Sequence, residues 1–174
     1  MIKLGLLGNN ISKSEMPNLI TKLGNEFGFE VKYKLFDQAL KSNFNFKNFL
    51  SQMKEKNISG INVTYPFKEL ALEHSIKLSE ETKLVKSTNL ILINESMTSY
   101  NTDYSGFLNT YKFNFNKEPS KLVILGGGGV GKSICFALIK LGVKELYIIE
   151  KDHIKLEKLI AVSYTHLTLP TTSA

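Results

Sequence analysis

Residues 121–133 read Lys-Leu-Val-Ile-Leu-Gly-Gly-Gly-Gly-Val-Gly-Lys-Ser, an apolar run that leads directly into a cluster of glycines. The apolar run predicts a strand over residues 121–125, and the pattern beyond the glycines predicts a helix over 130–141 and a second strand over 145–149. A glycine-rich turn between a strand and a helix is typical of a βαβ unit that binds a phosphate group at the N-terminus of the helix. The stretch therefore predicts that a nucleotide-binding α/β domain begins here.

The glycine cluster satisfies two phosphate-binding patterns. Gly126, Gly128 and Gly131 fit the dinucleotide fingerprint, in which glycines permit a tight turn and let the backbone approach a pyrophosphate. Gly131, Lys132 and Ser133 also complete the P-loop pattern that starts at Gly126, in which the lysine reaches the terminal phosphates and the serine binds magnesium. The cluster predicts a phosphate site, and the kind of nucleotide stays open.

The acid that ends the second strand leaves the same question open. Glu150 lies about 20 residues beyond the fingerprint, where an acid can hold a ribose 2′-hydroxyl. In a P-loop protein the same carboxylate could serve a magnesium site, and an exposed glutamate at a strand end is the plainest interpretation.

Strands and helices alternate through the residues before this unit. The pattern predicts strands over residues 3–8, 31–36, 58–63, 88–93 and 97–101, the last two joined by a tight turn at 94–96. It predicts helices over 14–27, 46–56 and 103–111, and a mostly helical stretch over 68–84 that breaks near Ser79. Such alternation indicates an α/β fold with a parallel or mixed sheet and helices on both faces.

Two segments interrupt this organisation. Residues 112–120 are polar, contain Pro119 and lack a helical period, so we expect a domain linker there. Residues 162–174 contain no Lys in a Lys-rich chain and carry four Thr. This stretch resembles the conceptual translation of a sequencing adapter, and we expect a non-native tail rather than part of the fold.

Composition narrows the class of protein. A hydrophobic content of 43% with 22% charged residues is ordinary for a globular chain that buries a core. The single cysteine, Cys135, excludes an internal disulfide and permits a reducing compartment. The sequence shows no signal-peptide core and no apolar run near the roughly 20 residues of a membrane helix, so we expect a cytoplasmic protein without a membrane partner.

Charge and histidine content exclude two further classes. The net charge is +6, but all 22 basic residues are lysines scattered along the chain, so we expect no nucleic-acid partner. Of the three histidines, His166 lies in the expected tail, and His74 and His153 form no cluster, so we expect no metal.

Two segments of the front half carry polar residues where chemistry is expected. Residues 60–68 read Gly-Ile-Asn-Val-Thr-Tyr-Pro-Phe-Lys, a strand-to-helix transition in which Lys68 opposes the helix macrodipole. Residues 100–106 read Tyr-Asn-Thr-Asp-Tyr-Ser-Gly, and taken alone they are a helix start capped by Thr102 or Asp103. Lys68 considered alone is most simply a surface lysine of a Lys-rich protein.

Taken together, these segments resemble the shikimate dehydrogenase family. The family's Gly-x-Asn-Val-Thr-x-Pro-x-Lys motif is matched at every fixed position by residues 60–68, and its Asn-Thr-Asp-x-x-Gly motif by residues 101–106. The family's opening motif is partly matched by residues 8–17, and its Ala-Val-Asn-Thr motif by residues 86–90. With the glycine loop, five elements occur in the family's order, and the resemblance covers residues 1–155.

The resemblance implies a fold, a reaction and a set of site residues. It implies an N-terminal substrate-binding α/β domain over residues 1–111, followed by the start of a Rossmann domain over 121–161. The implied reaction is the NADPH-dependent, reversible reduction of 3-dehydroshikimate to shikimate in chorismate and aromatic amino acid biosynthesis. The implied catalytic residues are Lys68 and Asp103, and with them Ser14, Thr64 and Asn89 would bind the substrate. The implied cofactor-binding residues are Gly126, Gly127, Gly128, Gly129, Val130, Gly131, Glu150 and Lys151.

Departures from the family pattern keep alternatives open. Met16 stands where the family has a second substrate-binding serine, and Leu90 stands where a threonine follows Asn89, which would suit a non-catalytic binding paralogue. Glu150 and Lys151 stand where the family has an arginine for the NADP 2′-phosphate, which would suit an NAD-preferring quinate/shikimate dehydrogenase. A P-loop protein is the alternative of another class. The rest of the family's cofactor domain and its C-terminal substrate residues are absent, so we expect this chain to be inactive alone; its oligomeric state is not predicted.

Overall fold

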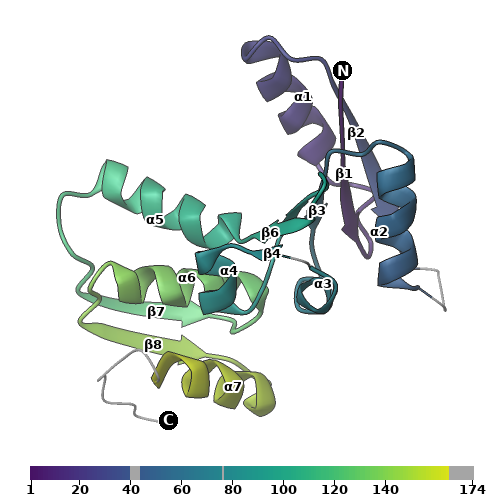
Figure 1. The fold of residues 1–174 in the computed structure, drawn as a ribbon. Helices are drawn as coiled ribbons and strands as arrows, with labels where there is room; N and C mark the ends of the chain where they lie inside the picture. The colour runs from purple at the N-terminus through teal and green to yellow at the C-terminus, as the bar shows by residue number, and fades with distance from the viewer. Residues whose placement is uncertain (40–43, 76, 165–174) are drawn as a thin grey trace. The chain divides into compact units, whose positions relative to one another are not determined.

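The computed structural model describes residues 1–39, 44–75 and 77–164 (Figure 1). The chain divides into two compact units, Met1–Asn101 and Thr102–Ala174, with a six-stranded and a two-stranded sheet respectively. Helix α5 (Thr102–Asn114) belongs to the second unit because it packs on α6 (Gly129–Lys140). The division therefore falls before the linker expected at 112–120, whose first three residues are the end of α5.

The first unit is built on a mixed sheet. Strand β1 (Ile2–Gly8) is flanked by two parallel strands, β2 (Val31–Asp37) and β3 (Gly60–Val63). Strand β5 (Leu90–Leu92) pairs antiparallel with β3, and β6 (Thr98–Tyr100) pairs antiparallel with β5. Strand β4 (Lys77–Leu78) closes the edge parallel to β6, which gives the order β2-β1-β3-β5-β6-β4. The expected mixed α/β sheet is confirmed.

The core of this unit lies between the sheet and helix α2 (Phe46–Glu55). The helix buries residues at helical spacing, and its first turn is capped by Asn45, whose side chain accepts the Asn48 N–H at 2.9 Å. Each large apolar side chain buried in this way contributes about 1.5–3 kcal/mol to folding. The fully or nearly buried side chains of the core include Leu7, Phe46, Phe49, Leu50, Met53, Ile61, Val63 and Ile91.

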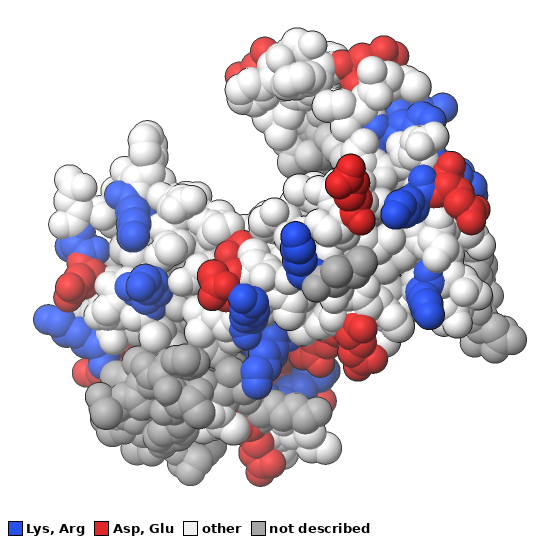
Figure 2. Space-filling model, viewed as in Figure 1, with Lys and Arg blue, Asp and Glu red and all other residues white. Residues whose placement is uncertain are grey.

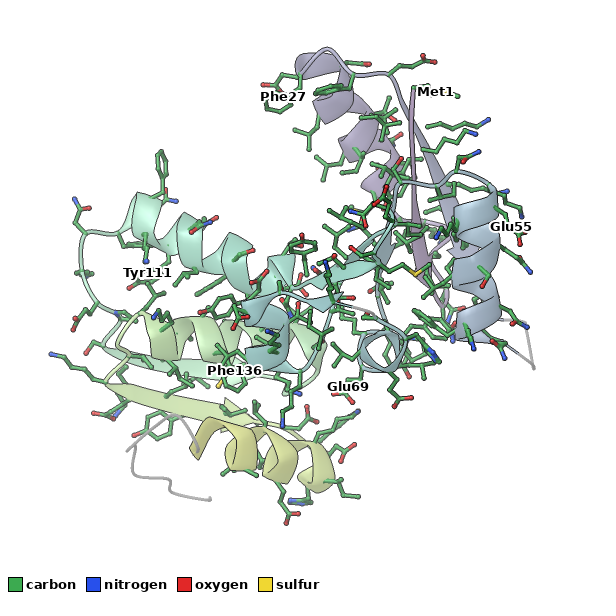
Figure 3. All side chains as sticks on the ribbon, in the orientation of Figure 1. Met1, Phe27, Glu55, Glu69, Tyr111 and Phe136 are labelled. Carbon is green, nitrogen blue, oxygen red and sulfur yellow. The ribbon has the colours of Figure 1, made fainter. Side chains whose placement is uncertain are left out.

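Helix α1 (Met16–Glu26) is present as expected, but its apolar stripe is not buried. Leu19 is 50% exposed and Phe27, just beyond the helix, is 69% exposed (Figure 3). The helix approaches β2 through Gly24, where an added Cβ would lie 2.5 Å from a methyl carbon of Val31. Helical spacing thus identified the helix, while close packing at a glycine decides which side meets the sheet.

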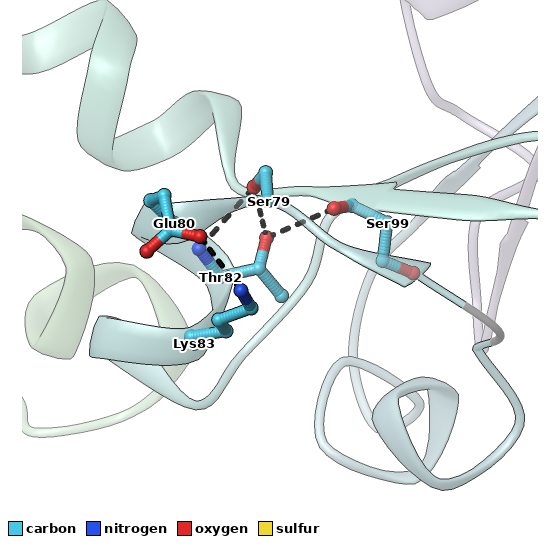
Figure 4. Close-up of polar contacts among 5 residues, drawn as sticks. All are labelled: Ser79, Glu80, Thr82, Lys83 and Ser99. Carbon is cyan, nitrogen blue, oxygen red and sulfur yellow. Dashed lines mark hydrogen bonds and ion pairs between the residues drawn. The ribbon is translucent and has the colours of Figure 1, made fainter.

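The stretch expected to be mostly helical contains two short helices and an edge strand. Helix α3 (Leu70–Glu73) is separated from α4 (Glu80–Val85) by β4, and the break falls at Ser79 as expected. Ser79 caps α4 by accepting the Thr82 N–H, and the buried Thr82 hydroxyl donates to the Ser99 carbonyl at 3.2 Å (Figure 4). These bonds hold α4 against β6.

The second unit begins with the expected βαβ arrangement. Strands β7 (Lys121–Leu125) and β8 (Glu145–Ile149) are parallel and in register, and α6 connects them. Helix α6 buries the consecutive residues Cys135, Phe136, Ala137 and Leu138, which point around the helix, and Phe136 is labelled in Figure 3. The start of a Rossmann domain is therefore confirmed.

Helix α7 (His153–Tyr164) follows β8 and was not predicted from the sequence. It takes in residues 162–164 of the expected tail, and residues 165–174 lie outside the described residues. No helix within the described ranges is long and apolar enough to cross a membrane. On the face shown in Figure 2, lysines and acidic side chains are interspersed.

Candidate active site

The segment Gly60–Lys68 leaves the sheet at the carboxyl ends of β1 and β3, the edge where α/β sheets commonly bind ligands. The Thr64 N–H donates to the Leu7 carbonyl at 2.9 Å, which extends the pairing by one residue beyond β3. A turn follows, closed by the Phe67 N–H on the Thr64 carbonyl at 2.9 Å, with a cis bond before Pro66. Thr64 and Lys68 are both half-buried at this edge.

Asn89 is brought to the same segment by backbone hydrogen bonds. Its carbonyl accepts the Val63 N–H at 2.8 Å, and the preceding Thr88 N–H donates to the Lys68 carbonyl at 3.0 Å. The Thr88 hydroxyl donates to the Tyr100 carbonyl at 2.7 Å, so this segment is also tied to β6. Three expected substrate residues, Thr64, Lys68 and Asn89, therefore lie on two chain segments that are bonded to each other.

Tyr33 and Asn62, for which the sequence predicted no role, support this arrangement. The Tyr33 hydroxyl donates to Asn62 Oδ1 at 2.8 Å, and Asn62 Nδ2 lies 3.4 Å from the Asn89 carbonyl. Burial raises the pKa of Tyr33, so its hydroxyl stays a proton donor across the physiological range. In the sequence, the one feature that indicates such a role for Asn62 is its polar side chain inside an otherwise apolar strand.

Ser14 lies on the loop between β1 and α1, and the start of this loop contacts the Thr64 turn. The Asn9 N–H at the start of this loop donates to the Tyr65 carbonyl at 3.0 Å. The Thr64 methyl lies over Gly8 so closely that an added Cβ would be 2.4 Å from it, which explains the glycine at this position. Ser14 is half-buried, and its hydroxyl accepts the Met16 N–H at 3.3 Å at the start of α1.

The Asn101–Gly106 motif crosses from the first unit into the second. The fully buried Asn101 donates from Nδ2 to the Ser87 carbonyl at 2.7 Å, which ties the motif to the segment that carries Asn89. Asp103 is the second residue of α5 and is half-buried. Because Lys68 belongs to the first unit and Asp103 to the second, their pairing stays a prediction.

The glycine loop fits a dinucleotide better than a nucleoside triphosphate. Helix α6 already begins at Gly129, and an added Cβ at Gly131 would lie 1.9 Å from the Gly126 carbonyl oxygen. This close approach is the role of the third glycine of the dinucleotide fingerprint. The Ser133 hydroxyl is buried and donates to the Gly129 carbonyl at 2.8 Å, a bond within the first turn of α6.

The open side of the loop is where a pyrophosphate would lie. Gly126 has a φ of +97°, and no atom lies within 4 Å of a Cβ added there or at Gly128. Gly128 caps α6 without a side-chain hydrogen bond, so the first N–H groups of the helix have no side-chain cap. Gly127, Gly129 and Val130 complete the loop, and these features fit the pyrophosphate of a dinucleotide.

Glu150 lies against this loop at the end of β8. Its carboxylate accepts the Asp152 N–H at 2.9 Å and the Gly127 N–H at 2.7 Å. These two bonds hold the pKa of Glu150 below its usual range, so the group is ionised at neutral pH. The following Lys151 is exposed. A carboxylate therefore stands beside the glycine loop.

The family model and the curated relatives that match this chain all describe shikimate dehydrogenases. The family model for the shikimate dehydrogenase substrate binding domain matches residues 6–91. A shikimate dehydrogenase (NADP(+)) of Clostridium botulinum is 30% identical over 168 residues, which cover 93% of this chain and 64% of that protein. One of Caldicellulosiruptor saccharolyticus is 29% identical over 162 residues, which cover 91% and 57%. The chain thus spans somewhat less than two thirds of these relatives.

Solved structures agree in fold. The quinate dehydrogenase of Corynebacterium glutamicum in complex with NAD superposes with a TM-score of 0.84 at 28% identity, covering 94% of this chain and 60% of that one. The shikimate 5-dehydrogenase of Thermus thermophilus in complex with NADP(H) and shikimate gives 0.79 at 27% identity, covering 93% and 60%.

The fold and the two sites define a protein of the class that joins an N-terminal substrate-binding α/β domain to a Rossmann domain. Within that class, residues 6–91 match the shikimate dehydrogenase substrate binding domain, and the relatives named above are shikimate dehydrogenases similar to this chain over most of its length.

Proposed function

We propose that this chain is the substrate-binding portion and the first part of the cofactor domain of a dehydrogenase that interconverts 3-dehydroshikimate and shikimate. The observation that carries the proposal is the bonded pair of segments at the carboxyl edge of the first sheet. Two backbone hydrogen bonds join these segments: the Thr88 N–H donates to the Lys68 carbonyl, and the Val63 N–H donates to the Asn89 carbonyl. As a result, Thr64, Lys68 and Asn89 lie on neighbouring segments. The expected substrate domain over residues 1–111 and the cytoplasmic location remain part of this proposal.

The side chains at this edge suit a hydroxylated cyclic acid. Ser14, Thr64 and Asn89 offer hydroxyl and amide groups for its carboxylate and ring hydroxyls. In the reduction, the Lys68 ammonium donates a proton to the oxygen of the developing alkoxide, and Asp103 orients that ammonium. A bound nicotinamide dinucleotide would supply the hydride to the ketone carbon, with its pyrophosphate held by the loop Gly126–Gly131.

The proposal is tested by titrating the chain with shikimate while following backbone amide signals by NMR. Shikimate is expected to shift the signals of Ser14, Thr64 and Asn89 in a saturable way. A titration with an acyclic carboxylic acid serves as the control, and equal responses to both compounds would count against a shikimate-type site.

Glu150 favours a second candidate function, a dehydrogenase that prefers NAD. Its ionised carboxylate beside the glycine loop would repel the 2′-phosphate of NADP and accept hydrogen bonds from the bare ribose of NAD. The relatives named above are NADP(+) enzymes, whereas the quinate dehydrogenase structure contains NAD. Both dinucleotides are therefore kept in the proposal.

Replacing Glu150 with alanine is expected to shift the preference toward NADP. The ratio of kcat/KM for NADP over NAD should rise roughly three- to tenfold in the complete gene product, the size of one like-charge contact at a partly exposed site. Loss of the hydrogen bond from Gly127 would weaken the binding of both dinucleotides alike, so it would leave the ratio of kcat/KM unchanged. Steady-state kinetics with each dinucleotide measures this, with Glu157→Ala on α7 as the control, and an unchanged ratio would remove Glu150 as a determinant.

A further inference from the structure

The exposed carboxylate of Asp37, the last residue of β2, accepts backbone N–H groups from two loops. Its Oδ1 accepts the Asn10 N–H and the Ala39 N–H, both at 3.0 Å, and its Oδ2 accepts the Ile11 N–H at 2.9 Å. Hydrogen bonds to an ionised acceptor are roughly twice as strong as bonds between neutral groups. Asp37 therefore holds the loop that follows β1, although it lies 26 or more residues further along the chain.

This loop needs an external support. Asn10 has a φ of +56°, in the left-handed region that asparagine adopts more readily than most other residues with a Cβ, so the loop turns sharply at this residue. The loop belongs to no helix or strand, so few of its N–H groups have a partner of the regular kind. The buried Ile11 side chain anchors it from one side and the Asp37 carboxylate from the other.

Ile11 links Asp37 directly to Ser14. The Ile11 N–H donates to Asp37, and the carbonyl of the same residue accepts the Ser14 N–H at 2.9 Å. One residue thus connects the carboxylate to the serine that we propose binds substrate. The start of the loop is independently bonded to the Thr64 turn through the Asn9 N–H on the Tyr65 carbonyl.

We propose that Asp37 is a positioning residue for the substrate site. By fixing Asn10 and Ile11 it holds the Ser14 hydroxyl in the one loop conformation that can bind a hydroxylated cyclic acid next to Thr64. This role rests on the proposed function.

The ionisation of Asp37 agrees with this role. The Ala39 N–H, and after it those of Ile11, Asn10 and Ser12, hold the pKa of Asp37 below its usual range. The group is therefore fully ionised at neutral pH, where the loop would be in its binding conformation.

The test measures shikimate affinity and loop order in the chain and its variants. Asp37→Ala is expected to weaken shikimate binding about tenfold, because affinity falls in proportion to the population of the binding-competent loop. It should also speed hydrogen exchange at the amides of Asn10 and Ile11. Asp37→Asn should fall between, since its carbonyl oxygen can serve Asn10 and Ala39 while its NH₂ group cannot accept from Ile11.

Two controls separate positioning from stability. Glu55→Gln, which removes a carboxylate from the exposed end of α2 (Figure 3), should leave the affinity unchanged. Met53→Ala removes a core side chain and should lower the melting temperature without weakening binding well below that temperature.

Unchanged affinity in Asp37→Ala, in a chain that binds shikimate, would overturn the role of Asp37 and leave the proposed function standing. Failure of the unaltered chain to bind shikimate would overturn the proposed function together with the substrate role of Asp37. If hydrogen exchange at Asn10 and Ile11 is unchanged in Asp37→Ala, the claim that Asp37 holds this loop is wrong, whatever the affinity for shikimate.

Discussion

Replacing Lys68 with alanine is expected to lower turnover of the complete gene product by about 10²–10⁴-fold, the range of a lost general acid. The Michaelis constant should change much less, because a proton donated to a developing alkoxide is an interaction of the transition state. The Lys68 backbone is held by the Thr88 N–H on its carbonyl, so alanine should leave the path of the chain intact.

Steady-state kinetics at saturating dinucleotide measures this effect. Lys47→Ala removes an exposed lysine from α2 and should retain normal kinetics, with a stability change within about 0.5 kcal/mol. Near-normal turnover in Lys68→Ala would mean that Lys68 is a surface lysine, and the catalytic assignment would be lost.

The predicted pairing of Lys68 with Asp103 can be tested in the same assay. Asp103→Ala should depress turnover by a similar factor, and the double variant should lose far less than the product of the two single losses, because residues that act as a unit are not additive. Multiplicative losses would show that the two side chains act independently.

Local patterns predicted most of the elements because their signals lie within a few residues. Apolar spacing placed α2, and alternation with a three-residue turn placed the antiparallel pair β5 and β6. Strand β4 was missed because its two residues are a strand only through pairing with β6, about which residues 77–78 carry no signal of their own. The exposure of the apolar stripe of α1 has the same kind of cause, since the packing at Gly24 depends on Val31.

The sequence motifs of the candidate site could be recognised in advance, but the contacts between their residues could not. Residues 60–68 and Asn89 could be named from their resemblance to a family, but the bond from Thr88 to Lys68 depends on how β3 and β5 pair. Tyr33 and Asp37 escaped notice because their bonds to Asn62 and Ile11 join strands and loops far apart in the chain. Short-range patterns cannot carry such long-range partnerships.

Replacing Gly131 with alanine is expected to abolish dinucleotide binding and to destabilise the second unit. The added Cβ would lie 1.9 Å from the backbone carbonyl oxygen of Gly126, and a backbone atom cannot rotate away as a side chain can. The first turn of α6 must therefore shift away from the loop after β7, which carries the N–H groups proposed to hold the pyrophosphate. Overpacking of this kind costs about 1–3 kcal/mol or more.

Gly128→Ala is the matched control, because it adds the same methyl group three residues earlier. Gly128 has an extended backbone with φ −68° and ψ −174°, and no atom lies within 4 Å of the added Cβ. This variant should keep the fold of the second unit, and any loss of affinity would come only from crowding of the ligand. Thermal unfolding and dinucleotide titration of the complete gene product measure both effects. Equal melting temperatures for the two variants would contradict the close approach of α6 to Gly126, and with it the assignment of the loop to the dinucleotide fingerprint.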